Sequence, residues 1–204
     1  MMISSCQRSK VKGQSIKVSK FLSRARLKRL LGLSVVCALG LGLVSVCLGG
    51  RLWLNPTASV PPGLYLLSKI DTDAGDAPLQ TGDLVLACLP WEAAALGRER
   101  GYLLPGSCPG GSSPVGKYVA ARAGSEITVD ASGVRVDGAY LPHSRPQTAD
   151  AEGRALRHAG GGRLRDDEFW LWSPHPQSYD SRYSGPVKSA ALYGRLKPLW
   201  LWGS

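Results

Sequence analysis

The chain has 204 residues and a formal net charge of +10, from 25 basic and 15 acidic residues. Nine of the basic residues and none of the acidic ones lie in residues 1–29, so residues 51–204 hold 16 basic and 15 acidic residues and are almost neutral. This distribution argues against a nucleic-acid-binding domain, and the five cysteines contain no C-x-x-C pair, which excludes a redox motif or zinc cluster of that type.

Residues 30–50 form an uncharged run of 21 residues. At about 1.5 Å per residue, a helix of this length crosses a bilayer core of roughly 30 Å. By the positive-inside rule, the basic residues before it predict a cytoplasmic N-terminus. We therefore predict a basic cytoplasmic tail over 1–29, a transmembrane helix over 30–50 and one exported domain over 51–204. A cleaved signal peptide and a lipoprotein signal are the alternatives for the uncharged run, and a nucleic-acid-binding tail is the alternative for the basic residues.

Short segments with strand character, bounded by turn residues, recur in the exported part. They cover residues 63–70, 83–89, 115–121, 126–130, 134–136, 169–172 and 193–199. A short helix is possible over 91–100, and the polar residues 145–165, rich in Gly, Ala and Arg, predict a surface loop. The pattern indicates a mainly β domain of antiparallel strands.

Cys88 and Cys108 are the two cysteines of the exported part. Two cysteines in an oxidising compartment favour a disulfide, which here would close a loop of about 20 residues and contribute about 3 kcal/mol. Two unpaired buried thiols are the alternative.

Ser59 lies nine residues after the uncharged run. A serine hydroxyl is a poor nucleophile until a base takes its proton. The spacing of the histidines at 143, 158 and 175 does not favour any of them for this role. A lysine can replace histidine where burial lowers the pKa of its amine. Lys117, with apolar neighbours on both sides, is the best placed lysine, although a lysine at a strand edge with its amine in solvent is the alternative.

Three sequence boxes resemble those of the S26 signal peptidase family, and they occur in the family's order. Residues 55–65 (NPTASVPPGLY) resemble the serine box, most closely the N-x-T-x-S-x-P-x-G-L-Y pattern of the conjugative-transfer branch called TraF. Residues 116–120 (GKYVA) are similar to the lysine box, and residues 178–187 (SYDSRYSGPV) resemble the closing S-x-D-S-R-Y-x-G box. Residues 101–111 also resemble the TraF branch.

The resemblance implies a role for the residues of the first two boxes. Ser59 would attack the scissile carbonyl, and Lys117 would take its proton and later deliver it to the leaving amine. Thr57 would join the Ser59 N–H in an oxyanion hole, with the capping of a turn as the simpler alternative. The resemblance implies no cofactor and no metal.

The closing box supplies the supporting residues. Asp180, with Ser178, would orient the lysine or complete a triad, and Arg182 would pair with Asp180. A buried ion pair that only braces the fold is the alternative. The sequence departs from general signal peptidases at Val60, where those enzymes carry methionine, and at Ser125, where aspartate is expected. These departures favour a specialised peptidase.

The resemblance thus implies a membrane-anchored serine endopeptidase in the bacterial inner membrane, with its catalytic domain in the periplasm. It would process leader or terminal segments of exported proteins, such as a pilin precursor in conjugative transfer. Its partners would be that precursor and the inner-membrane lipid, with no nucleic acid. Hydrolysis and the joining of pilin ends into a ring both stay open. The alternatives are a general type I signal peptidase and a catalytically silent β module of a transfer or secretion channel.

Overall fold

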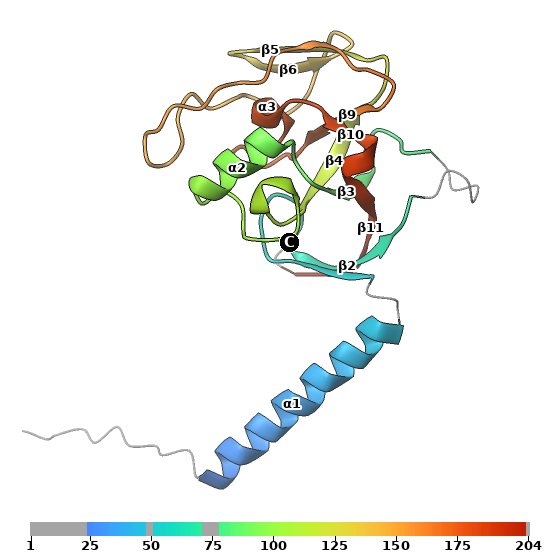
Figure 1. Cartoon of the computed structure of the whole chain (residues 1–204), viewed down its shortest axis with the longest axis vertical. Coiled ribbons are helices and arrows are strands. Elements are labelled where there is room, and N and C mark those ends of the chain that lie inside the picture. The colour runs from blue at the N-terminus through green and yellow to red at the C-terminus, as the bar shows by residue number, and fades with distance from the viewer. Residues whose placement is uncertain (1–23, 48–50, 71–77, 203–204) are drawn as a thin grey trace, which may run out of the picture. The chain divides into compact units, whose positions relative to one another are not determined.

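The computed structural model describes residues 24–47, 51–70 and 78–202, and the chain divides into a unit ending at Cys47 and a unit beginning at Leu48 (Figure 1). The first unit holds helix α1 (Arg24–Cys47), which begins inside the predicted tail. The last three residues of the predicted membrane span, 48–50, lie outside the described residues. Among the described helices, none is both long enough and apolar enough to cross a membrane, so the predicted span finds no support in the structure.

The second unit is built from two antiparallel sheets, which confirms the predicted mainly β domain. The larger sheet has the order β1-β2-β11-β3-β4-β9-β10, and the smaller β7-β6-β5-β8. The strands of the larger sheet are β1 (Leu52–Asn55), β2 (Gly63–Ser68), β3 (Leu84–Ala87), β4 (Val115–Ala121), β9 (Glu168–Trp172), β10 (Val187–Lys188) and β11 (Leu192–Leu201). Those of the smaller sheet are β5 (Glu126–Asp130), β6 (Gly133–Val136), β7 (Ala139–Tyr140) and β8 (Gly162–Arg163).

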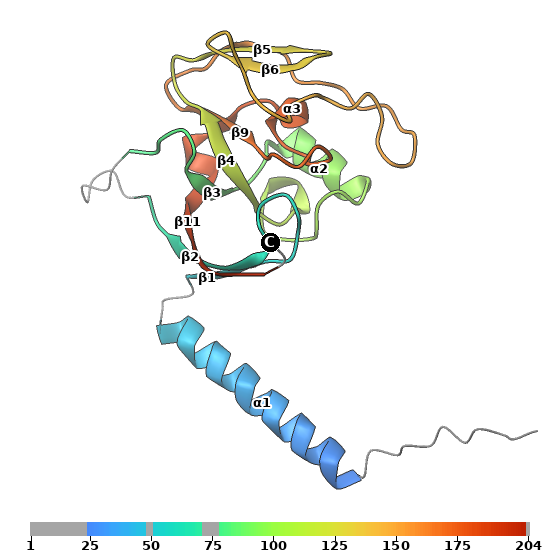
Figure 2. The same cartoon turned by 180° about the vertical axis from the view of Figure 1, so that it is seen from behind.

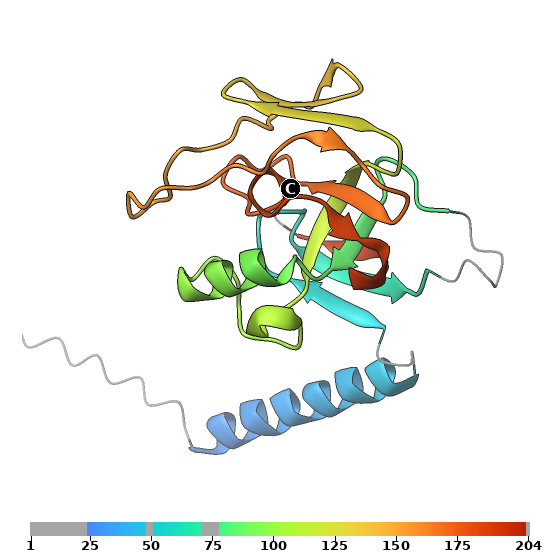
Figure 3. The ribbon, with the colours of Figure 1, turned by 45° about the horizontal axis from the view of Figure 1, so that its top comes forward.

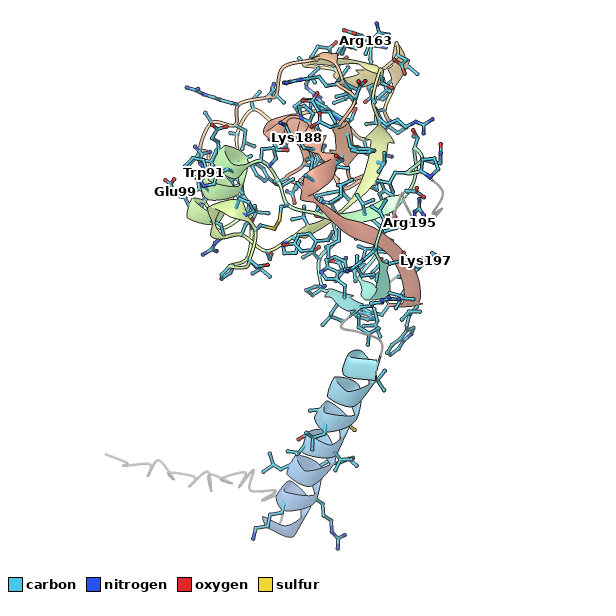
Figure 4. The ribbon with its side chains drawn as sticks, turned by 45° about the vertical axis from the view of Figure 1, so that its right-hand side comes forward. Trp91, Glu99, Arg163, Lys188, Arg195 and Lys197 are labelled. Atoms are coloured by element: carbon cyan, nitrogen blue, oxygen red, sulfur yellow. A yellow bond between two sulfur atoms is a disulfide. The ribbon has the colours of Figure 1, made fainter. Side chains whose placement is uncertain are left out.

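Four short helical segments complete this unit: α2 (Trp91–Glu99), η1 (Pro109–Gly111), α3 (Ser181–Ser184) and η2 (Ser189–Ala191). Figures 1 and 2 show α2 and α3 next to each other, and Trp91 and Glu99 mark the two ends of α2 in Figure 4. The helix predicted over 91–100 is therefore confirmed as α2. All seven predicted strand segments coincide with strands, whereas β1, β7, β8 and β10 were not predicted because two to four residues show no alternation.

Strand β4 lies inside the larger sheet, between β3 and β9, and both of its faces are covered. Val119 belongs to the apolar cluster that includes Val85 and Leu171, while Ala120 belongs to the cluster that includes Ile127 of the smaller sheet. Because apolar side chains cover both faces, a polar residue on this strand is removed from water. Lys117 is such a residue, since it lies on β4 opposite Val85 of β3.

The predicted disulfide is confirmed: Cys88 and Cys108 are bonded, with their Cα atoms 5.5 Å apart. The bond fastens the segment after β3 to the segment that enters η1 (Figure 4). Residues 101–114, which we call the tethered loop, lie mostly inside the covalent ring or directly beside it.

Replacing Cys88 and Cys108 together by alanine is expected to lower the free energy of unfolding by about 3 kcal/mol, because the unfolded chain loses a closed loop of about 20 residues. Urea denaturation followed by circular dichroism measures the loss. Cys37→Ala is the matched control, because Cys37 is a free, exposed cysteine. If the urea concentration at the midpoint of unfolding is the same in the double variant as in wild type, non-covalent contacts alone hold the tethered loop.

Candidate active site

Residues 55–62, which we call the serine loop, lead from the end of β1 to β2. Hydrogen bonds from Asn55, which is only 1% exposed, hold this loop in place. Its amide nitrogen donates to the carbonyl oxygens of Thr57, Val60 and Pro61 at 2.9, 2.9 and 3.2 Å. Its amide oxygen accepts from the N–H and the hydroxyl of Thr57 at 3.1 and 2.7 Å. One buried amide thus fixes the backbone on both sides of Ser59.

Of the two predicted oxyanion donors, the Thr57 hydroxyl already has an acceptor in the described structure and the Ser59 backbone N–H does not. The Thr57 hydroxyl donates to Asn55, which is the turn-stabilising arrangement weighed as the alternative. Its role toward an oxyanion stays a prediction, because the hydroxyl would have to turn away from Asn55. The backbone N–H of Ser59 has no hydrogen-bond acceptor among the described residues, so it is available to a developing oxyanion.

Lys117 brings an amine into the interior of the protein, where its side chain is only 2% exposed. Burial lowers the pKa of this amine from 10.5 to about 8, because the charged form loses its hydration. The negative charge of Asp180 raises the pKa and the positive charge of Arg182 lowers it, and both effects are smaller than that of burial. The amine therefore loses its proton far more readily than an exposed lysine does, and a minor fraction of it is neutral near physiological pH.

Gly116 allows the serine loop to lie against β4. A side-chain carbon at this position would lie 2.9 Å from the Trp53 ring and 3.3 Å from Val60, which is closer than such atoms normally approach. The absence of a side chain at Gly116 therefore lets β1 and the serine loop pack beside Lys117.

Ser178 connects the lysine to the serine. The Lys117 Nζ lies 2.6 Å from the Ser178 Oγ, which in turn lies 3.3 Å from the Ser59 Oγ. Within the described ranges, the Lys117 amine makes no direct hydrogen bond to Ser59. Because a hydroxyl both donates and accepts, this chain allows a proton to pass from Ser59 through Ser178 to a neutral Lys117.

Asp180 and Arg182 form the predicted pair, and both side chains are fully buried. Arg182 Nε donates to one carboxylate oxygen at 2.9 Å and Nη2 to the other at 2.8 Å. The same guanidinium donates to the backbone carbonyls of residues 143, 173, 175, 176 and 178. Asp180 makes no hydrogen bond to Lys117 in the part of the chain that the structure describes. The pair holds the backbone that carries Ser178, and it affects Lys117 through charge.

Sequence reasoning did not identify two residues that position the nucleophile. The first is Asn55, which stands in the serine box but gives no sign there of its hydrogen bonds. The second is Ser173, whose hydroxyl donates to the Ser59 carbonyl and whose N–H donates to Asp180 at 3.1 Å. Ser173 lies five residues before the closing box, and its sequence neighbourhood carries no signal of this role.

The histidines take no part in this chain of hydrogen bonds. His143 and His158 are exposed, and His158 contacts the Gln147 carbonyl at 3.1 Å. His175 accepts from the N–H of Gln177 through its Nδ1. In the described structure none of the three contacts Ser59 or Lys117 through a hydrogen bond, so the base expected from the geometry is the lysine.

A cavity of about 240 Å³ opens beside Ser59 and Lys117. Its walls come from β1 and the serine loop, from the tethered loop, from the first half of β4 and from Tyr179. Apart from Lys117, the residues that line the cavity carry no charge. The site therefore favours an uncharged, largely apolar segment.

The sequence matches the family described as "Signal peptidase, peptidase S26" over residues 27–202. This range contains every residue of the site. The chain belongs to the S26 signal peptidase family. The chain is 40% identical over 166 residues to the probable conjugal transfer protein TraF of Sinorhizobium fredii, with 81% of this chain and 85% of that protein covered.

A second relative, the conjugal transfer protein TraF of Agrobacterium fabrum, is 34% identical over 183 residues, which cover 88% of this chain and 98% of that protein. These two matches confirm the predicted resemblance to the TraF branch. Among solved structures, a signal peptidase I from Enterococcus faecalis is 16% identical, with a TM-score of 0.37, and the match covers 59% of this chain and 98% of that one.

Proposed function

We propose that this S26 protein is a serine endopeptidase in which Ser59 is the nucleophile and Lys117 is its base. The observation that carries the proposal is the chain of hydrogen bonds from a buried lysine amine through Ser178 to Ser59. Membership of a peptidase family supports it, as does the cavity beside Ser59, whose lining is uncharged apart from Lys117.

In this mechanism the Ser59 oxygen attacks the carbonyl carbon of the scissile peptide bond, while its proton passes through Ser178 to the neutral amine of Lys117. The Ser59 N–H stabilises the oxyanion that forms. The lysine ammonium then protonates the leaving amine, the C–N bond breaks, and an ester on Ser59 remains. Water attacks the ester, again with Lys117 as the base, and releases the acid.

The substrate we propose is a leader or terminal segment of an exported protein of a conjugative transfer apparatus, such as a pilin precursor. The TraF relatives are named for conjugal or plasmid transfer, which supports this class of substrate. If an amine of the substrate reaches the Ser59 ester before water does, the same intermediate would join two peptide ends. A general type I signal peptidase would instead rescue a cell depleted of its own signal peptidase.

Co-expression with the candidate pilin precursor tests the proposal, with the mass of the product as the readout. Wild type is expected to shorten the precursor, and Ser59→Ala is expected to leave it at full length. Ser189→Ala is the matched control, because Ser189 is an exposed serine that does not line this cavity. Equal processing by wild type and Ser59→Ala would show that Ser59 is not the nucleophile.

The pH dependence of cleavage follows from the lowered pKa of Lys117. Only the neutral amine accepts the serine proton, so kcat/KM is expected to rise about tenfold per pH unit below pH about 8 and to level off above it. Initial rates measured between about pH 5.5 and 9.5, in buffers of equal ionic strength, give kcat/KM at each pH. A rate that does not change across this range would contradict a lysine base.

Ser178→Ala is expected to lower kcat by about 10² or more with little change in KM, because it removes the group through which the proton passes. Steady-state kinetics on one peptide substrate measures both constants, with Ser189→Ala as the control. A kcat equal to that of wild type would mean that Lys117 moves to contact Ser59 directly.

The location of the enzyme stays a prediction. The uncharged run over 30–50 and the basic residues before it favour a single-pass inner-membrane protein with the catalytic unit in the periplasm. Carbonate extraction of bacterial membranes and protease accessibility in spheroplasts test the two parts of that prediction separately. Release of the full-length protein by carbonate would exclude the anchor.

A further inference from the structure

One wall of the catalytic cavity is aromatic and comes from two distant parts of the chain. Tyr102 of the tethered loop and Tyr179 both line the cavity, and their ring centroids lie 5.1 Å apart. Tyr179 directly follows Ser178, the residue that joins lysine and serine. A substrate segment that reaches Ser59 therefore passes beside these two rings, which we call the tyrosine wall.

The two rings are held in different ways. The Tyr179 hydroxyl donates to the Ala93 carbonyl of α2 at 3.1 Å, and its ring also stacks on Tyr183 at 5.8 Å. The backbone of Tyr102 is fixed to α2 through its N–H, which donates to the Gly97 carbonyl at 2.8 Å. That bond leaves the orientation of the Tyr102 ring to be set by other contacts.

Two of those contacts come from the Tyr179 ring and from Arg100, whose Nη1 donates to the Tyr102 hydroxyl at 3.5 Å. The others come from the polar loop that connects β7 to β8, which Figures 1 and 3 show running out beside α2. The Tyr102 hydroxyl donates to the carboxylate of Asp150. The guanidinium of Arg154 lies over the Tyr102 ring, 5.7 Å from its centroid, and its Nε donates to Asp150 at 2.6 Å. The loop thus holds Tyr102 by its hydroxyl and by one face of its ring.

Asp150 is built into this loop more firmly than a surface carboxylate usually is, since its side chain is only 7% exposed. It accepts the backbone N–H groups of Glu152 and Arg154 at 3.0 and 2.9 Å. Two further bonds fasten the loop beside α2: Arg100 donates to the Ala155 carbonyl at 2.9 Å, and Arg154 donates to the Arg100 carbonyl at 3.1 Å. Asp150 is therefore a fixed acceptor for the Tyr102 hydroxyl.

We propose that Tyr102 is a specificity-determining residue, whose ring limits the size of the substrate side chain beside it, and that Asp150 is a positioning residue acting through Tyr102. This inference rests on the proposed peptidase function. It assigns a role to a loop that is distant in sequence from all three boxes: the loop sets one wall of the cavity without supplying a reacting group.

The test uses the full-length protein and a synthetic library of uncharged peptides that differ in the size of one side chain, with cleavage read by mass spectrometry. Tyr102→Phe keeps the ring and removes its hydroxyl, while Asp150→Ala removes the acceptor. Each is expected to change the ratio of kcat/KM between small and large side chains by about tenfold, mainly through KM. Asp166→Asn is the control, because Asp166 is an exposed acidic residue outside the loop that contacts Tyr102.

A double variant with Tyr102→Phe and Asp150→Ala tests whether Asp150 acts by positioning Tyr102 or only by stabilising the fold. If Asp150 acts through Tyr102, Asp150→Ala has no further effect on the ratio in a Tyr102→Phe background. Hydrogen exchange supplies a readout besides activity: Asp150→Ala is expected to speed exchange in residues 101–104 and to leave the serine loop unchanged. An Asp150→Asn variant serves the same comparison if Asp150→Ala does not fold.

Two results would overturn the inference. The first is a Tyr102→Phe variant with the same ratio of kcat/KM between small and large side chains as wild type. The second is a double variant in which the effects of Tyr102→Phe and Asp150→Ala on that ratio add up. In either case cleavage by wild type and loss of cleavage in Ser59→Ala would still support the proposed function. If the wild-type enzyme cleaves neither the library nor the pilin precursor, the proposed function fails, and this inference fails with it.

Discussion

Lys117→Met is expected to abolish cleavage and to leave the protein at least as stable as wild type at pH 7. Loss of the base should reduce kcat by on the order of 10⁴ or more. The stability follows from burial, because the pKa of the amine in the folded protein is about 8 against a usual 10.5. Holding the charged amine in the interior below pH 8 therefore costs about 3 kcal/mol, and methionine removes that cost.

The pH dependence of stability has a definite sign. The pKa of Lys117 is lower in the folded state, so the unfolded chain binds more protons between pH 8 and 10.5, and wild-type stability rises across that window. The lost hydrogen bond to Ser178 offsets about 1 kcal/mol of the gain in the variant. Urea denaturation at pH 7 and pH 10 measures the difference.

Lys188→Met is the matched control for this experiment, because Lys188 is an exposed lysine on β10 (Figure 4). It is expected to change neither cleavage nor the pH dependence of stability. If Lys117→Met still cleaves the precursor, Lys117 is not the base. If its free energy of unfolding at pH 7 is lower than that of wild type by more than about 2 kcal/mol, the buried charged amine does not destabilise the folded protein.

Asp180→Asn is expected to lower the free energy of unfolding by about 3 to 5 kcal/mol, because it leaves the charge of Arg182 buried without its partner. Both side chains of this pair are fully buried and share two hydrogen bonds. Arg165→Gln is the control, since the Arg165 side chain is 77% exposed in its pair with Glu168 and should contribute at most about 1 kcal/mol.

The same variant distinguishes bracing from an effect on the base. The Asp180 charge raises the pKa of Lys117, so removing it should move the pH profile of cleavage by the folded fraction to lower pH. A loss of stability below about 1 kcal/mol would show that Arg182 is not held mainly by its charge partner. An unshifted pH profile would show that Asp180 affects only the fold.

The order of the sequence boxes was sufficient to predict the chemical groups of the candidate site but not their contacts. Ser59 and Lys117 were predicted as a pair, and this stays a prediction. The disulfide between Cys88 and Cys108 was predicted correctly. Each prediction depends on residue type and local context. Ser178 was predicted only as a supporting residue. Its place between serine and lysine depends on how the closing box packs against β4, which no local pattern encodes.

The parts that sequence reasoning missed depend on tertiary contacts. The amide of Asn55 gains its importance from a loop that folds back around it. The loop that contains Asp150 was correctly predicted as a surface loop, except for β8 at its end, yet its contact with Tyr102 joins residues 48 positions apart. Strand β10 has only two residues, which adopt a strand conformation because they pair with β9.

The most direct test of the central claim is a titration of the Lys117 amine by NMR in protein labelled on lysine side chains, with the signal assigned by its absence in Lys117→Met. The buried amine hydrogen-bonded to Ser178 is predicted to lose its proton with a midpoint near pH 8. A midpoint near the usual 10.5 would mean that the amine stays charged at physiological pH, and Lys117 would then be excluded as the base for Ser59.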